Sequence, residues 1–357
     1  MSSEWLPFTD LLSVIVDNRG RTCPVGDSGI PLIATNCIDR SNLYPSYVTT
    51  RYVSDETFRT WFRGHPKPGD ILFVCKGSPG RTNWVPDPVD FCIAQDMVAV
   101  RANPNKIYPK YLFAALRSHA VQSQIDNMHV GTMIPHFKKG DFGKLNIPVP
   151  SRNAQEVTGD FYFSISERIT LLRKTNATLE AIAQALFKSW FVDFDPVRAK
   201  LEGRAPEGMD EATAALFPDS FEVSALGLVP KGWGVGKLED LLVLQRGFDL
   251  PSSDRIPGNY PIIAASGPAG THKIAMAKAP GVVTGRSGVL GRVFLELEDY
   301  WPLNTTLWVK EFRAASPCYA YEVLSLLDFA SFNAGSAVPT LNRNHVHSLP
   351  YLIPSRA

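Results

Sequence analysis

A heptad repeat in the middle of the chain constrains the fold more than any other feature. Nine residues recur at steps of three and four and would form a seam along one side of a helix. All but Asn176 are apolar or aromatic: Tyr162, Ile165, Ile169, Leu172, Asn176, Leu179, Ala183, Leu186 and Trp190. Leu171, Ile182 and Phe187 widen this stripe. Such a/d spacing is typical of a helix that packs against another helix. We therefore expect a helix over about residues 154–194, a rod of roughly 60 Å at 1.5 Å per residue.

The sequence also predicts where this helix begins and ends. Asn153, followed three residues later by Glu156, is typical of an N-cap with a capping box. Pro196 cannot continue a helix, and no Pro or Gly lies between Asp160 and Asp195. Asn176 is the polar seam position, where an asparagine fixes register by requiring a partner. The alternative is an ordinary amphipathic helix on a globular core.

Length and composition set broad limits. The 357 residues predict two domains, and 45% apolar with 20% charged residues predicts ordinary folded cores. The five cysteines form no CxxC pair, so neither a zinc site nor a disulfide framework is expected. Neither a signal sequence nor an apolar run of membrane-spanning length is present, so we expect a cytoplasmic protein without membrane contact.

Charge gives only weak information about partners. The formal net charge is +1. Residues 5–150 hold 16 basic and 12 acidic side chains, whereas residues 151–232 hold 9 basic and 12 acidic ones. The distribution is compatible with DNA-facing lobes but does not require them.

Four matched segments indicate an internal duplication. In chain order, residues 68–81 match 280–292 with one residue of slack, 95–101 match 304–310, 109–111 match 317–319, and 131–151 match 335–355 without a gap. The last pair shares Gly-[Thr/Ser]-x-x-Pro followed by a Pro-Ser end. Because the order is preserved, the chain is predicted to hold two copies of one domain.

The predicted fold class is α+β, with two similar mixed α/β domains separated by a coiled-coil-type helix. Short β-rich runs at residues 11–16, 71–75 and 97–101, a helix near 109–127 and a strand end at 145–150 support a mixed first domain. The predicted limits are 1–152, 153–232 and 233–357. The middle segment contains the long helix and a connector with a short helix near residues 210–216.

No catalytic motif is found. The sequence lacks GxxxxGK[ST], HExxH, GxSxG and the [Asn/Asp]-Pro-Pro-[Tyr/Phe] motif of amino-methyltransferases, to which Asp195-Pro-Val is the nearest approach. The Gly-rich run at 285–291 superficially resembles a phosphate-binding loop, but its repeat partner at 76–80 is predicted to be a strand-to-turn element. We therefore predict no catalytic residue, no metal site and no cofactor in this chain.

Two kinds of loop recur in both copies and are the candidate DNA contacts. They combine small residues, which allow close backbone approach, with basic and amide side chains that contact phosphates and bases. The candidates are Lys76, Ser78, Arg81, Thr132, Lys138, Lys139, Arg286, Ser287, Arg292, Ser336, Asn342, Arg343 and Asn344. For any single residue a solvated hairpin is the simpler interpretation, but recurrence at matched places favours binding.

The segment after the helix carries a family resemblance. Residues 186–200, Leu216-Phe-Pro-Asp219 and 228–233 resemble the central conserved region of specificity subunits of type I restriction–modification systems. The two Gly-[Thr/Ser]-x-x-Pro segments resemble the ends of that family's target recognition domains. The resemblance implies a subunit that recognises a bipartite site in double-stranded DNA. It also implies that methyltransferase (modification) subunits dock on the chain, and restriction (motor and nuclease) subunits join through the complex.

The resemblance places catalysis elsewhere. S-adenosylmethionine, ATP and Mg²⁺ are expected only in the partner subunits, and the helix is expected to fix the spacer between the two half-sites. Two other functions stay open: a protein-interaction scaffold with a dimerising coiled coil, and a self-contained restriction–methylation enzyme, which the missing motifs disfavour.

One departure from the family concerns the helix seam. Members usually have a second long helix after the second recognition domain, whereas this sequence stops at Ala357. Either the chain is a truncated form or another chain supplies the second helix, and we expect the seam to be covered by a modification subunit or by a second copy through self-association. The predicted interface residues are Ile165, Ile169, Leu172, Asn176, Leu179, Leu186 and Trp190.

Overall fold

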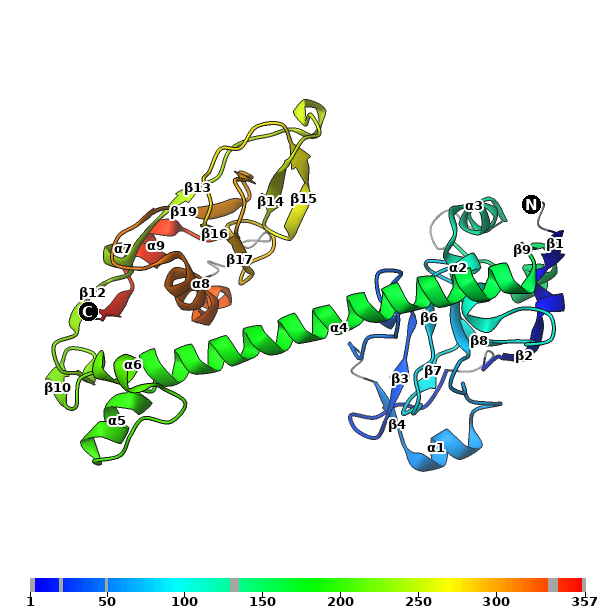
Figure 1. The fold of residues 1–357 in the computed structure, drawn as a ribbon, viewed down its shortest axis with the longest axis horizontal. Coiled ribbons are helices and arrows are strands. Elements are labelled where there is room, and N and C mark those ends of the chain that lie inside the picture. The colour runs from blue at the N-terminus through cyan, green and yellow to red at the C-terminus, as the bar shows by residue number, and fades with distance from the viewer. Residues whose placement is uncertain (1–3, 19–21, 49–50, 129–134, 333–339, 355–357) are drawn as a thin grey trace. The chain divides into compact units, whose positions relative to one another are not determined.

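The computed structural model describes residues 4–354 apart from 19–21, 49–50, 129–134 and 333–339. The chain forms two compact units, unit 1 (Met1–Thr178) and unit 2 (Leu179–Ala357). The long helix α4 (Arg152–Phe191) contributes its first part to unit 1 and its last part to unit 2 (Figure 1). Each unit is described by itself below.

Three sheets form unit 1. Its strands are β1 (Glu4–Pro7), β2 (Leu12–Val16), β3 (Ile30–Ile33), β4 (Tyr52–Val53), β5 (Ile71–Val74), β6 (Thr82–Trp84), β7 (Cys92–Ile93), β8 (Met97–Ala102) and β9 (Asn146–Val149). The sheet orders are β1-β9, β2-β8-β5-β6 and β4-β3-β7, and only the β3–β7 pair is parallel. The strands predicted at residues 11–16, 71–75, 97–101 and 145–150 are thus confirmed.

The helices of unit 1 differ from prediction at one point. They are α1 (Asp55–Thr60), α2 (Pro109–Arg117), α3 (His119–Met128) and the first part of α4. The prediction of a single helix near 109–127 was wrong. The helix is interrupted at Ser118, whose backbone is extended. The Ser118 hydroxyl donates to the carbonyl of Ala115 (2.7 Å) and accepts from the N–H of Val121 (3.4 Å). One side chain therefore closes α2 and caps α3.

Aromatic side chains form the core of unit 1. Phe8, Phe73 and Phe142 are fully buried and pack with ring centroids 5.2–6.0 Å apart. All four residues of β5 are buried, because α2 covers one face of its sheet and the β3–β7 layer covers the other. Helix α4 joins this core through Phe163, whose ring lies 5.0 Å from that of Trp84.

Gly159 sets the approach of α4 to α2. A Cβ at this position would lie 2.6 Å from the backbone nitrogen of Tyr111 and 3.0 Å from the carbonyl carbon of Lys110. On the same side of α4, the Gln155 side chain accepts from the N–H of Tyr108 (2.8 Å). The backbones of the two helices are therefore in close contact at Gly159, and Figure 1 shows α2 beside the first part of α4.

Unit 2 repeats the topology of unit 1. Its strands are β12 (Gly234–Lys237), β13 (Leu242–Arg246), β14 (Tyr260–Ala264), β15 (Gly267–His272), β16 (Gly281–Gly285), β17 (Val293–Glu296), β18 (Trp301–Pro302), β19 (Thr306–Phe312) and β20 (Pro350–Ile353). The orders β12-β20, β13-β19-β16-β17 and β15-β14-β18 reproduce those of unit 1, including one parallel pair, β14–β18. The predicted duplication and α+β class are confirmed.

The remaining helices of unit 2 and the connector follow short local signals. They are α5 (Asp195–Leu201), α6 (Glu211–Ala215), α7 (Leu238–Leu241), α8 (Pro317–Leu326) and α9 (Arg343–His347). The side chain of Asp210 accepts from the N–H of Thr213 (2.6 Å) and caps α6, which confirms the predicted short helix. A hairpin of β10 (Phe221–Ser224) and β11 (Gly227–Pro230) completes the connector.

Both predicted ends of the long helix were wrong. Helix α4 already includes Asn153, and its first turn closes through the bond from the N–H of Gln155 to the carbonyl of Ser151 (3.0 Å). It stops at Phe191, because Phe194 adopts a left-handed conformation with φ 58°. Pro196 lies in the first turn of α5, where its missing N–H leaves no bond unmade.

The heptad seam faces outward. Five of its apolar residues expose between 41% and 58% of their surface: Ile165, Ile169, Leu172, Leu179 and Leu186. Asn176 is also exposed. Trp190, by contrast, is half-buried against Phe217, and Phe187 is buried against Tyr319, so neither belongs to the exposed stripe. The helix thus buries side chains near its two ends and exposes the seam between them.

A pH-dependent contact ties α9 to β13. The Nε2 atom of His347 accepts from the N–H of Leu244 (2.8 Å), which requires an unprotonated nitrogen. Burial lowers the pKa of His347, with smaller effects from Glu239, which raises it, and from Arg343 and Arg313, which lower it. Because the unfolded chain takes up this proton at higher pH, the stabilisation is present above about pH 6.5 and is lost as the pH falls below it.

The free energy of unfolding of the wild type should fall between pH 7.5 and pH 5.5. We expect this fall to be smaller in His347→Gln, by on the order of 1 kcal/mol. Thermal unfolding of the full chain at the two pH values measures it. His345 lies two residues away and is exposed. His345→Gln should keep the wild-type pH dependence, and equal behaviour of the two variants would contradict this assignment.

Candidate nucleic-acid interface

The turns that follow β5 and β16 have the same backbone hydrogen bonding. In unit 1 the N–H groups of Cys75 and Lys76 donate to the carbonyl of Asp96 (2.9 and 3.2 Å). In unit 2 the N–H groups of Arg286 and Ser287 donate to the carbonyl of Thr305 (2.8 and 3.1 Å). Lys76 of unit 1 therefore corresponds to Ser287 of unit 2. The one-residue gap in the sequence match lies before the turn.

Glycines shape both turns. Gly77 and Gly80 have φ of 90° and 80°, and Gly288 and Gly291 have φ of 89° and 82°. These values lie in the left-handed region that favours glycine. Each turn thus presents its backbone without interfering side chains at the same two positions.

The structure brings the turn and the late loop of each unit together. Lys76 forms a β-bridge with His136, and Ser287 forms the equivalent bridge with Thr340. Two residues anchor the late loops: the N–H of Phe137 donates to Cys75 (2.9 Å), and that of Leu341 donates to Arg286 (2.8 Å). Phe137 and Leu341 are both buried. The two loops that were predicted separately therefore form one surface in each unit.

In unit 1 the predicted basic residues divide into two groups. Lys76 and Lys138 are exposed. Lys139 forms an ion pair with Asp17 (3.1 Å), and the Arg81 guanidinium donates from Nη1 to the carbonyl of Ile38 (3.1 Å). Lys76 and Lys138 are thus the cations that this surface presents to solvent, while Lys139 and Arg81 support the loops. Ser78 is half-buried in the same turn.

In unit 2 the two arginines also brace neighbouring backbone. Arg286 donates from Nη1 to the carbonyl of Asn304 (3.3 Å), and Arg292 donates from Nη1 to the carbonyl of Ser266 (3.0 Å). Arg292 nevertheless remains exposed, whereas Arg286 and Ser287 are half-buried.

The predicted late-loop residues of unit 2 begin a helix. Asn342 caps α9, because its Oδ1 accepts from the N–H of Asn344 (3.0 Å). Arg343 and Asn344 are exposed in the first turn of α9. Thr132 and Ser336 lie outside the described residues, so the structure does not place them.

Part of the chain resembles a known protein family. Residues 40–181 match the family model of the type I restriction modification DNA specificity domain. This part of the chain is therefore similar to the DNA specificity domain of type I restriction–modification systems. The matched range includes the turn at Lys76, the late loop of unit 1 and most of α4.

Two curated proteins that are similar to this chain carry corresponding names. The HindI specificity subunit of a type I restriction enzyme from Haemophilus influenzae is 30% identical over 218 residues, 49% of this chain and 47% of that protein. The MjaIX specificity subunit from Methanocaldococcus jannaschii is 25% identical over 170 residues, 44% of this chain and 35% of that protein. The chain therefore spans less than half of the length of each relative in these matches.

A solved structure also matches over most of the chain. The S subunit of a type I restriction–modification system from M. genitalium matches 93% of this chain and 83% of its own length, with 15% identity and a TM-score of 0.47. The HsdS subunit from Thermoanaerobacter tengcongensis matches 98% of this chain, with 15% identity and a TM-score of 0.35.

Two other kinds of site are absent from the described ranges. There, no group of three or more His, Cys, Asp or Glu side chains could hold a metal ion. Nor does any helix in the described part of the chain have the length and apolar character to cross a membrane.

Proposed function

We propose that the chain is the specificity subunit of a type I restriction–modification complex and that each unit contacts one half of a bipartite site in double-stranded DNA. The observation that carries the proposal is the paired surface of turn and late loop, built with the same backbone hydrogen bonds in both units. The side chains on these two surfaces differ, as two readers of different half-sites require.

The proposal assigns catalysis to partners. Modification subunits, with S-adenosylmethionine, and restriction subunits, with ATP and Mg²⁺, carry the chemistry, and the complex acts on DNA in the cytoplasm. The exposed seam of α4 is the proposed docking site of the modification subunits. Purified chain alone should transfer no methyl group from S-adenosylmethionine to DNA, and transfer by the chain alone would support a self-contained enzyme instead.

Footprinting tests the bipartite site. With cognate modification subunits present, we expect two protected segments on DNA separated by a gap. Deletion of either unit should abolish protection of one segment. A single contiguous footprint would contradict the proposal.

The surface cations Lys76 and Lys138 give a more local prediction. We expect the double substitution to alanine to weaken DNA binding about ten-fold at moderate salt, because two phosphate contacts are lost. The slope of log K against log salt should fall by about 1 for each lysine. A gel-shift titration over several salt concentrations measures both quantities.

Lys67 and Lys106 supply the matched control. Both are exposed, and both lie at the other end of the antiparallel β5–β8 pair from the Lys76 turn. Their double substitution to alanine removes the same charge. A loss of binding and of salt slope equal to that of the Lys76 and Lys138 variant would show that only total charge matters.

The second candidate function is a protein-interaction scaffold that dimerises through α4. The exposed apolar seam favours it specifically. A gel shift against random and genomic DNA separates the two functions, because a scaffold of this kind has no DNA affinity. Binding to both DNA pools with a preference for certain sequences supports the specificity subunit.

A further inference from the structure

We propose that a hollow in unit 1, beside the paired loops, reads a base pair of the DNA half-site, with Gln95 and Asn36 as its specificity-determining side chains. This inference rests on the proposed function in DNA binding. It assigns a reading role to residues outside the turn and late loop, and it names the kind of base that they select.

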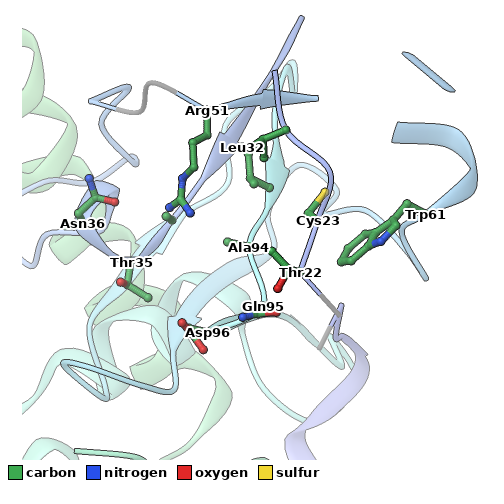
Figure 2. A pocket seen from close by; sticks show the side chains of 12 residues that line it. Thr22, Cys23, Leu32, Thr35, Asn36, Arg51, Trp61, Ala94, Gln95 and Asp96 are labelled. Atoms are coloured by element: carbon green, nitrogen blue, oxygen red, sulfur yellow. The ribbon is translucent and has the colours of Figure 1, made fainter. Parts of the chain in front are cut away.

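The position of the hollow follows from the parallel strand pair. Strands β3 and β7 are adjacent and parallel, so their carboxyl ends open at the same edge of the sheet. Thr35 and Asn36 follow β3 after one intervening residue, and Gln95 and Asp96 follow β7 after one intervening residue. With Arg51 they line a hollow of about 190 Å³ (Figure 2).

The hollow is continuous with the candidate DNA surface. Asp96, on its wall, accepts through its backbone carbonyl from the N–H groups of Cys75 and Lys76. Lys76 in turn forms the bridge to His136 of the late loop. The hollow therefore borders the turn that carries Lys76.

The amide side chains have the chemistry to read a base. Each carries a donor and an acceptor, which together match the N7 acceptor and the N6 amino group of adenine in the major groove. Gln95 is exposed, and its amide makes no hydrogen bond within the described ranges. Asn36 is also exposed, and its Oδ1 accepts only a weak bond from Sγ of Cys37 (3.8 Å). Neither amide is occupied by the fold.

A cation completes the hollow. In Figure 2 the side chain of Arg51 extends into the space above Thr35 and Asp96. A guanidinium there would contact a phosphate or a base edge near the amides. The hollow thus combines two amides, Arg51 and the carboxylate of Asp96 beside a basic turn, a polar lining that fits the edge of duplex DNA better than an apolar ligand.

Unit 2 holds different side chains at the matching positions. By strand register, Ile33 of unit 1 corresponds to Ile263 of unit 2, and Ile93 corresponds to Pro302. The residues of unit 2 that correspond to Asn36, Arg51, Gln95 and Asp96 are, in this order, Ser266, Gly270, Asn304 and Thr305.

The fold uses two of these matching side chains internally. The amide of Asn304 donates to Asp249, and the hydroxyl of Thr305 accepts from the N–H of Ala265 (3.3 Å). The backbone is thus the same while the polar side chains and their partners differ. Variation of this kind at matched positions is what two units with different sequence preferences require.

The test is a map of methylated sites produced by the full chain co-expressed with cognate modification subunits. For Gln95→Ala, and separately for Asn36→Ala, we expect the preference for one A·T pair in one half-site to fall about ten-fold or more. The other half-site should stay unchanged. Asn105→Ala is the control, because Asn105 is an exposed amide beyond the opposite end of β8.

The outcomes separate this inference from the function on which it rests. If the wild-type chain directs methylation to a bipartite site and both variants keep the wild-type half-sites, the hollow does not read DNA and the inference is wrong. Relaxation at a G·C pair would equally contradict the adenine assignment. If the wild-type chain directs no site-specific methylation, the proposed function itself fails. Unchanged thermal unfolding of both variants shows that any relaxation does not come from loss of fold.

Discussion

Replacing Gly159 with alanine is expected to lower the free energy of unfolding of unit 1 by about 1–3 kcal/mol, a typical cost of overpacking. At an exposed helix position the same change would stabilise the protein by roughly 0.5–1 kcal/mol, because glycine is the more flexible residue in the unfolded chain. The sign reverses here because the new Cβ would lie 2.6 Å from the backbone nitrogen of Tyr111. That nitrogen belongs to the first turn of α2 and cannot rotate away as a side chain could.

Urea unfolding of the full chain, followed by hydrogen exchange of the amides of β5, reports this change on unit 1 specifically. Ser164→Ala is the matched control, since Ser164 is exposed on the same helix. It should be neutral or slightly stabilising. A Gly159→Ala variant as stable as the wild type would show that α4 and α2 do not pack in the way described.

The double substitution of Ile165 and Ile169 with glutamate is expected to weaken binding of modification subunits by roughly 100-fold or more. Burial of an isoleucine side chain in an interface is worth about 1.5–3 kcal/mol, and a buried unpaired carboxylate adds a further cost. Both residues are exposed in this chain, so the fold itself should be unaffected. Co-purification and surface-binding measurements with cognate modification subunits give the affinity.

A charge-matched control comes from the other side of α4. Ala177 and Thr178 are exposed and lie away from the seam by helical spacing. Their double substitution to glutamate adds the same charge and should leave binding unchanged. If the Ile165 and Ile169 variant binds modification subunits normally but loses a dimer in sedimentation experiments, the seam serves a second copy of the chain instead.

The repeated features of the chain could be predicted from sequence, because a duplication shows every structural signal twice. Matched segments located the β5–β8 and β16–β19 pairs and the turns after β5 and β16. Local exceptions were harder to predict. Ser118 interrupts a stretch that has helical periodicity, and Phe194 ends α4 before the proline that should have ended it. Both depend on the conformation of one residue, which periodicity does not encode.

The candidate site was predictable only in part, because partners distant in sequence decide what each side chain does. Arg81 and Lys139 have the residue types of phosphate contacts, yet the carbonyl of Ile38 and the carboxylate of Asp17 hold them. Gln95 was visible only as a member of a matched segment. Its proposed role follows from the β3–β7 pairing, which places it in the lining of the same hollow as Asn36. A difference between repeats at a matched strand end, glutamine against asparagine, was the one available signal.

The backbone hydrogen bonds of the two turns affect which mutations the chain can accept during evolution. Asp96 and Thr305 hold their turns through carbonyl groups, which every residue type possesses. Mutations that replace the side chains around these carbonyls therefore leave the loop geometry in place. Under the proposed function, single substitutions in one unit would change the DNA sequence that this unit prefers, while the other unit keeps its preference and the fold of both units is retained.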